Sequence, residues 1–310
     1  MEIEKFALWQ KRQGNKVIQT ESSLWYEAGP HVFQAFPYDW VITPTEKELH
    51  DLLVKNKIAA VRFSTPVESQ LGKISYHIIK KPPYSIDCLK NKSKKNIYMG
   101  LSKCKVEEIS LAQLAKEGWA LQLNTLERQN RTDSMDKAKW ENICLSAEDI
   151  PGFSAWGAYV DGEMAASLLT ACIDGTAYFL YSLSHEKFMD LRVNHVIFFE
   201  VTQRLLQKEG IQKAFFTVQS LDAPKSVDDF KFRIGFEPIS VRQRVVFHPL
   251  LAPFITPFSH KLVLLLLQIS KKKNFLAKME GIMRFYLEGK RPLSQQKYPD
   301  CLLETQNNCY

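Results

Sequence analysis

The sequence predicts an α/β fold of the α+β kind, in which helices flank a mixed, mostly antiparallel sheet. Three observations predict it. Two Asp-Gly pairs separate three apolar runs between residues 153 and 183, a pattern typical of an antiparallel meander. A long amphipathic helical pattern follows the last of these runs. A strand, a helix and a further strand come next, and a strand-helix-strand succession predicts a parallel pair beside the meander.

The predicted meander has strands at Phe153–Val160, Glu163–Ile173 and Thr176–Leu183. Asp161-Gly162 and Asp174-Gly175 form its two turns. A two-residue type I′ turn needs positive φ at both central positions, which Asp-Gly adopts at low cost.

The segment after the meander predicts a helix, a strand, a short helix and a last strand. Their bounds are Asp190–Glu209, Lys213–Gln219, Ser226–Ile234 and Phe236–Phe247. The long helix has one apolar face, and Gly210 is a natural stop for it.

The sequence before the meander predicts further helices and strands. Thr45 and Glu48 have the spacing of a capping box, so a helix should begin at Thr45 and run to Lys57. The other elements expected here are strands at Ala59–Phe63 and Lys73–Ile79, and helices at Leu114–Leu126 and Asp136–Leu145. A basic helix is expected near residues 89–105, with Ile97, Leu101 and Cys104 on one face.

We therefore predict three regions: residues 1–108, residues 109–248 and a C-terminal helical tail at 249–310. The tail contains the apolar run Leu262–Leu267, followed by Lys271–Lys273. The run is far shorter than the roughly 20 residues of a membrane-spanning helix. It could lie on an anionic membrane surface, pack over the core or form a dimer contact.

The composition is that of a globular protein, with 45% hydrophobic and 24% charged residues. The net charge of +7 indicates an anionic partner: a phosphate-bearing cofactor, RNA or an acidic membrane surface. Solubility alone explains it equally well.

The six cysteines have no C-x-x-C spacing, which excludes a zinc-finger pattern and a disulfide scaffold. No metal is implied. The N-terminus begins with acidic residues and has no apolar run of a signal peptide, so we expect a cytoplasmic protein, with peripheral binding to the inner membrane surface as an alternative.

Two motifs carry a resemblance to a known family. Phe230–Pro238 reads F-K-F-R-I-G-F-E-P and resembles the helix-to-strand junction of GNAT acyltransferases, usually F-Y-x-K-L-G-F. The basic stretch from Leu89 to Lys105 resembles helices of Fem-type aminoacyltransferases, which carry two GNAT-like halves in tandem. The resemblance implies a tandem GNAT-like fold, with a degenerate half at 1–108 and an acyltransferase half at 109–248.

The resemblance also implies a function: transfer of an acyl or aminoacyl group to an amine or hydroxyl of an envelope- or polysaccharide-related acceptor. The donor would be an acyl-coenzyme A or, as in Fem-type proteins, an aminoacyl-tRNA.

In GNAT enzymes a glycine-rich turn before a helix binds the donor pyrophosphate through backbone N–H groups. The matching segment here, Ser184–Asn194, contains no glycine. Asp190 would cap the following helix and add negative charge, whereas Arg192 could contact a phosphate. The donor-binding candidates are Tyr181, Ser182, Leu183, Asp190, Leu191, Arg192, Val193, Asn194 and Ser220. They could equally shape only a helix end.

The catalytic candidates are His185, Glu186 and Lys231. The donor should enter where strands 176–183 and 213–219 part, so His185 or Glu186 would be the general base. Lys231 stands where the family often has a tyrosine general acid, and it could stabilise an oxyanion. The alternatives are a surface loop histidine at 185 and a solvated surface lysine at 231, and His195 is expected to be packed.

The lysines of the basic helix could bind a phosphate-bearing substrate. They are Lys90, Lys92, Lys94 and Lys95. Only Tyr98 lies near them as an aromatic residue, so no sequence-specific nucleic-acid recognition is predicted. A solvated helix face is the alternative.

A second function remains open. The missing glycines favour a GNAT-shaped module without catalysis, which would bind RNA, lipid or protein through its basic surfaces.

Overall fold

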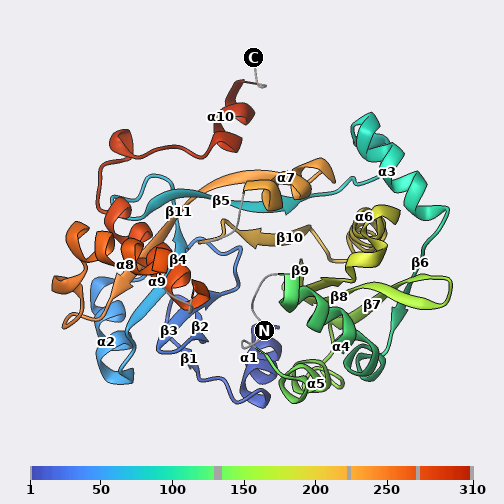
Figure 1. Ribbon diagram of the computed structural model, residues 1–310. Helices are drawn as coiled ribbons and strands as arrows, with labels where there is room; N and C mark the ends of the chain where they lie inside the picture. The colour runs from blue at the N-terminus through green and yellow to red at the C-terminus, as the bar shows by residue number, and fades with distance from the viewer. Residues whose placement is uncertain (1, 129–134, 222–224, 270–272, 308–310) are drawn as a thin grey trace. The chain divides into compact units, whose positions relative to one another are not determined.

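The computed structural model describes residues 2–128, 135–221, 225–269 and 273–307 (Figure 1). Contacts divide the chain into two compact units. The first unit comprises Met1–Gly14, Ile79–Phe216 and Asp228–Glu237. The second unit comprises Asn15–Ile78, Thr217–Val227 and Pro238–Tyr310.

These units do not coincide with the predicted boundaries at 108 and 248, because the chain passes between them repeatedly. Strand β11 (Glu237–Phe247) pairs antiparallel with β4 (Ala60–Thr65), from Arg242 opposite Thr65 to Phe247 opposite Ala60. The strand that should have closed the acyltransferase half therefore belongs to the sheet of the second unit.

In the first unit, the strand order is β10-β9-β8-β7-β6. The bounds are β6 Lys105–Ile109, β7 Phe153–Val160, β8 Glu163–Ile173, β9 Thr176–Ser184 and β10 Lys213–Val218. Strands β6 to β9 pair antiparallel, and β10 pairs parallel with β9. The meander and its parallel neighbour are confirmed. Strand β6 was not predicted.

Both turns of the meander have the expected backbone. Asp161 and Gly162 have φ of 50° and 81°, and Asp174 and Gly175 have φ of 46° and 75°. Positive φ at both central residues is the type I′ arrangement.

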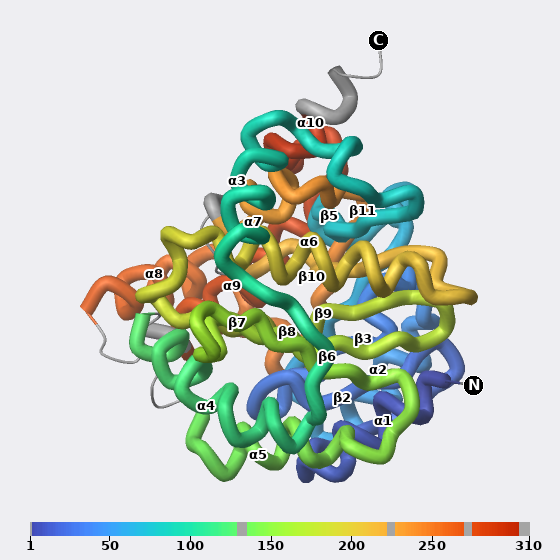
Figure 2. Tube along the Cα trace, turned by 90° about the vertical axis from the view of Figure 1, so that its right-hand side faces the viewer, coloured from blue at the N-terminus to red at the C-terminus, as the bar shows by residue number. Residues whose placement is uncertain are grey.

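Helices cover both faces of these strands (Figures 1 and 2). Helices α4 and α5 lie on one face, and α6 lies on the other. The helices of this unit are α1 Ile3–Arg12, α3 Asn91–Leu101, α4 Leu111–Arg128, α5 Lys137–Leu145, α6 Val193–Leu206 and α7 Lys225–Arg233. The buried rings of Trp140, Trp156 and Tyr178 fill the core between them.

In the second unit, the strand order is β1-β2-β3-β4-β11-β5. The remaining bounds are β1 Val17–Gln19, β2 Leu24–Gly29, β3 Val32–Phe36 and β5 Lys73–Lys80. Helix α2 (Glu46–Asn56) packs on a core that includes Trp25, Val61 and Phe63. Its N-cap is confirmed: the Glu48 N–H donates to the Thr45 hydroxyl at 3.1 Å.

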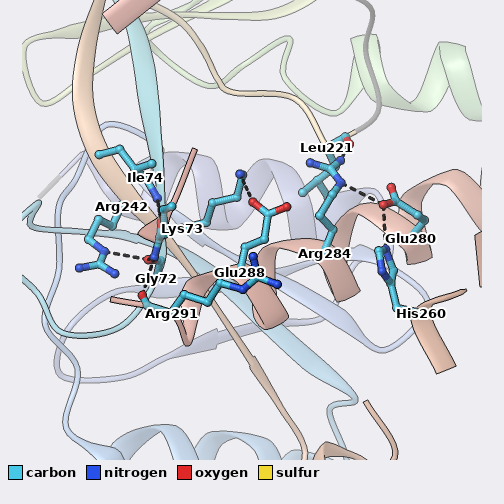
Figure 3. Close-up of polar contacts among 11 residues, drawn as sticks. Gly72, Lys73, Ile74, Leu221, Arg242, His260, Glu280, Arg284, Glu288 and Arg291 are labelled. Atoms are coloured by element: carbon cyan, nitrogen blue, oxygen red, sulfur yellow. Dashed lines mark hydrogen bonds and ion pairs between the residues drawn. The ribbon is translucent and has the colours of Figure 1, made fainter. Parts of the chain in front are cut away.

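The tail after His248 contains α8 (Pro257–Ile269), α9 (Lys273–Gly289) and α10 (Asp300–Asn307). Helix α9 is held to the second unit by polar contacts (Figure 3). Lys73 pairs with Glu288, and the Arg284 guanidinium donates to the Leu221 carbonyl at 2.6 Å. The Phe285 ring is fully buried, with the Arg62 guanidinium 5.3 Å from its centre. This part of the tail packs over the core.

No helix within the described ranges is long and apolar enough to cross a bilayer.

Two expected helix details were wrong. On α3, the buried face is formed by Ser93, Ile97 and Gly100, whereas Leu101 is exposed. Cys104 is buried but lies beyond the helix end.

Candidate donor-binding site

Strands β9 and β10 stop pairing before either strand ends, at the place where the donor was expected to enter. Their parallel ladder runs from Lys213 opposite Thr176 to Phe215 opposite Tyr178. Strand β9 continues to Ser184 beyond the last of these pairs. Parted parallel strands leave room for a ligand at the carboxyl ends of the strands.

A β-bulge in β9 places Phe179 and Tyr181, which are two residues apart, on different faces of the sheet. Phe179 lies opposite Thr170, but Tyr181 lies opposite Leu169, so Leu180 is the extra residue. The Phe179 ring therefore packs against α6, and the Tyr181 ring packs 5.8 Å from the Trp140 ring of α5. The bulge separates the predicted candidate Tyr181 from the face that carries α6.

Aromatic rings line the opening between β9 and β10. The half-buried Phe216 is the first residue of β10 beyond the ladder, and its ring centre lies 5.4 Å from that of Phe179. Phe198 of α6 stacks on Phe216 at 4.6 Å, and Phe230 of α7 packs on Phe198 at 5.8 Å. The opening therefore has an apolar floor.

Lys231 lies against this floor. It is 6% exposed, and its Nζ lies 2.7 Å from the Asp228 carboxylate and 5.0 Å from the centre of the Phe216 ring. The interpretation as a solvated surface lysine is wrong, because helix α7 places Lys231 on its inner face. A buried ammonium requires a partner such as Asp228.

The N-terminus of α6 lies beside the same opening. Arg192 is the N-cap residue, with φ of 63° and no side-chain capping bond. Its Nε is buried and has no hydrogen-bond partner among the described residues. The first N–H groups of a helix also lack intrahelical acceptors, and the helix dipole favours an anion there.

Asp190 does not cap this helix. It lies in a 3₁₀ turn, Glu186–Leu191, and its side chain is exposed. The predicted helix therefore began three residues too early. Arg192, in the left-handed conformation, turns the chain into α6 instead.

His195 lies in the first turn of α6 and was expected to be packed. Burial, followed by the charges of Arg192 and Arg233, lowers its pKa to about 4. Its Nε2 lies 3.4 Å from the Asn96 amide of α3. The imidazole is therefore neutral at pH 7, and two guanidinium groups surround it.

Helix α3 places the predicted lysines near this end of α6. A Cβ on Gly100 would overlap Val196 and lie 3.2 Å from the Leu191 carbonyl oxygen, so the two helices are in close contact. Lys90, Lys92 and Lys95 are exposed, and Lys94 lies 3.7 Å from Asp87. The Ser93 hydroxyl donates to the Arg233 carbonyl at 2.6 Å, which joins α3 to α7.

His185 and Glu186 lie in the loop between β9 and α6. His185 Nδ1 accepts a hydrogen bond from the Lys187 N–H at 3.3 Å. The Glu186 N–H donates to Asn124 of α4 at 2.9 Å. The second of these contacts joins the segment to α4.

The other candidates fall in several environments. Ser182 is exposed, whereas Leu183 and Val193 are buried, and Leu191 is half-buried. The Asn194 amide donates to the Ser184 hydroxyl at 3.2 Å, so it holds the end of β9. Ser220 belongs to the second unit. Asp222, two residues further along the chain, lies outside the described residues.

Sequence reasoning missed Asn96, Asp228 and Arg233 and set His195 aside. Arg233 lies within the F-K-F-R-I-G-F motif, which could have indicated it. Asn96 and Asp228 had no sequence signal, because only the packing of α3 and α7 brings them to the site.

A separate concavity of about 740 Å³ lies at the outer edge of the first unit. Glu107, Glu117 and Tyr159 are among its lining residues, and none of the predicted site residues lines it. Within the described ranges, no cluster of histidine, cysteine and acidic residues could hold a metal ion.

No protein-family model and no curated protein matches the sequence. Solved structures are similar to the fold. The crystal structure of FemX has a TM-score of 0.56 at 12% identity and covers 80% of this chain and 92% of its own. A conserved protein of unknown function from Bacteroides thetaiotaomicron has a TM-score of 0.52 at 10% identity, with coverage of 79% and 90%.

The third similar structure is the C-terminal domain of a candidate lysylphosphatidylglycerol synthetase from Agrobacterium fabrum. Its TM-score is 0.50 at 10% identity, with coverage of 81% of this chain and 89% of that domain. Identities this low establish the fold alone. The chain has a Fem-like, GNAT-type fold, as the sequence motifs implied.

Proposed function

We propose that the protein transfers an acyl or aminoacyl group from a phosphate-bearing donor to an amine or hydroxyl acceptor. One observation carries the proposal: the buried, unpartnered Nε of Arg192 at the N-terminus of α6, beside the opening between β9 and β10. A buried guanidinium N–H without an acceptor is costly, and a donor phosphate would satisfy it.

The donor phosphates would contact the N–H groups of α6 and the Arg192 side chain. A glycine-free turn keeps the backbone farther from a phosphate than the usual glycine-rich turn does. Arginine can compensate for this distance, because its side chain is long and its guanidinium donates two hydrogen bonds to phosphate oxygens. Acyl-coenzyme A and aminoacyl-tRNA both carry such phosphates, and either fits this chemistry.

The reaction would be a direct attack. The acceptor nitrogen or oxygen bonds to the donor carbonyl carbon, and its proton passes to His185, Glu186 or water. The carbonyl oxygen carries the negative charge until the bond to the leaving thiol or tRNA hydroxyl breaks, and that leaving group then takes up a proton. Lys231, whose charge faces Phe216 at 5.0 Å, would support the oxyanion electrostatically. We place the acceptor among envelope- or polysaccharide-related amines and hydroxyls.

Titration of the purified protein with acetyl-coenzyme A and with aminoacyl-tRNA tests the proposal. Arg192→Ala should weaken binding of the true donor about tenfold to a hundredfold, the effect of losing a charged hydrogen bond. Lys187→Ala is the matched control, because Lys187 lies in the same segment but pairs with Glu163 at 2.6 Å. Absence of binding of both donors at millimolar concentration would refute the proposal.

A non-catalytic binding module is the second candidate. It is favoured by the His185 ring, whose Nδ1 already accepts the Lys187 N–H and therefore serves the local turn. Donor binding without transfer to any amine or hydroxyl acceptor, and without accelerated donor hydrolysis, would support the module and exclude the enzyme.

A further inference from the structure

Helix α8 of the tail exposes a continuous apolar stripe. Phe258, Leu262, Leu265 and Ile269 are 80%, 50%, 59% and 80% exposed. At 100° per residue, the four side chains fall within about 60° of one another around the helix. Phe254, just before the helix, is another exposed ring at 72%. Soluble surfaces rarely gather so many large apolar side chains in one place.

The opposite side of α8 is fixed to the protein. Val263 is buried, and the His260 ring lies 2.9 Å from the Glu280 carboxylate of α9 (Figure 3). Glu280 also accepts a hydrogen bond from Arg284, which in turn donates to the Leu221 carbonyl. The stripe is therefore held on the outer side of an anchored helix pair.

The sequence around the stripe is basic. Between Glu237 and Glu280 the sequence contains no acidic residue. Of the two arginines in this stretch, Arg242 is buried and Arg244 pairs with Glu46. The lysines of the stretch are Lys261, Lys271, Lys272, Lys273 and Lys278. Lys261 is exposed and lies along one edge of the stripe, and Lys278 is exposed on α9. Lys271 and Lys272 lie outside the described residues, but they follow Ile269 closely in the sequence.

We propose that α8 docks on an anionic lipid bilayer, with the stripe in the interface and Lys261 at the headgroups. An apolar face beside basic residues is the pattern of interfacial helices. Each lysine near an anionic surface contributes about 1 kcal/mol, so the basic stretch adds strongly to the burial of the stripe.

A second copy of the chain fits this surface less well. A two-fold contact places a patch against itself, so basic residues would face basic residues. The stretch from 238 to 279 supplies no carboxylate to neutralise them. An anionic bilayer supplies that neutralisation across its whole surface.

Co-sedimentation of the full chain with vesicles tests the proposal. The protein should pellet with phosphatidylglycerol-containing vesicles and much less with phosphatidylcholine vesicles. The double variant Phe258→Ser/Leu265→Ser should bind about tenfold more weakly or worse, because two large side chains no longer leave water. Lys261→Gln should weaken binding roughly fivefold.

Val54→Ser is the matched control, since Val54 is 39% exposed on α2 of the same unit. It should pellet like the unaltered protein, and circular dichroism should report the same fold for all variants. Equal pelleting of the double variant would overturn the proposal. So would a dimer in light scattering that the double variant converts to monomers without vesicle binding, which would assign the stripe to a second copy.

Discussion

Burial and neighbouring charges strongly affect the pKa of the histidine beside Arg192. His195 is half-buried, and its partial burial and the charges of Arg192 and Arg233 lower its pKa to about 4. Both arginines repel a proton from the imidazole, so an anion that neutralises them should restore its affinity for protons. The pKa of His195 should therefore rise if a phosphate-bearing donor binds as proposed.

We predict that NMR titration gives His195 a pKa near 4 in the free protein and a higher pKa with coenzyme A bound. The folded-state pKa lies below the ordinary value of 6.5, so the unfolded chain binds the proton more tightly. Stability should fall as the pH falls from about 6.5 towards 4, by about 1–2 kcal/mol after allowance for partial exposure.

Comparison with His195→Gln in urea unfolding at several pH values measures this contribution. The variant should lack that part of the pH dependence. An unchanged pH profile would place the imidazole in contact with solvent rather than beside two arginines.

Lys231 and Asp228 form a buried ion pair. Removal of one partner leaves a buried charge, so Lys231→Met should cost about 3–5 kcal/mol of folding free energy. The double variant Lys231→Met/Asp228→Leu should cost less than Lys231→Met alone, because no charge remains buried. Urea unfolding of the two single variants and the double variant completes a double-mutant cycle. Additive changes in the free energy of unfolding would show that the two side chains do not interact.

At the scale of elements, the close packing of α3 on α6 depends on a residue without a side chain. A Cβ on Gly100 would overlap Val196. Gly100→Ala should therefore destabilise the first unit by about 1–3 kcal/mol, despite the better helix propensity of alanine.

Gly29→Ala is a suitable control, because a Cβ at Gly29 meets no atom within 4 Å. Its effect in thermal unfolding should stay within about 0.5 kcal/mol. An equally stable Gly100→Ala protein would mean that α3 can shift away from α6 at no cost.

The elements also differ in how well the sequence predicts them. Strands β7 and β8 match their predicted bounds, since an Asp-Gly turn directly follows each of them. The junction at Gly235 is confirmed, with φ of 92°. The strands at 17–36 and at 105–109 were missed. Three of these four strands, β1, β3 and β6, have five residues or fewer, which is too short for a clear period of two.

At the scale of the whole molecule, the charge of +7 is unevenly placed along the sequence. The stretch from 238 to 279 holds seven basic residues, two in β11 and five in the tail, and no acidic one. The predicted anionic partner could therefore be two partners, a donor at α6 and a lipid surface at α8. The Arg192→Ala and Phe258→Ser/Leu265→Ser variants separate these two, since each should affect only its own ligand.

Local sequence patterns were enough to predict the meander, the parallel strand after it and the GNAT-like junction. These features depend on local signals: turn residues with positive φ, a period of two in strands, and a helix stop. The absence of glycine from residues 184–194 is also visible in the sequence.

Only the tertiary structure decided which residues form the site. The bulge in β9 turns Tyr181 away from α6, α7 buries Lys231 against Phe216, and α3 brings Asn96 to His195. It also decided that β11 pairs with β4 and that α9 packs while α8 exposes its stripe. Such contacts join residues far apart in the chain, and their energy depends on packing in space, which local sequence patterns do not encode.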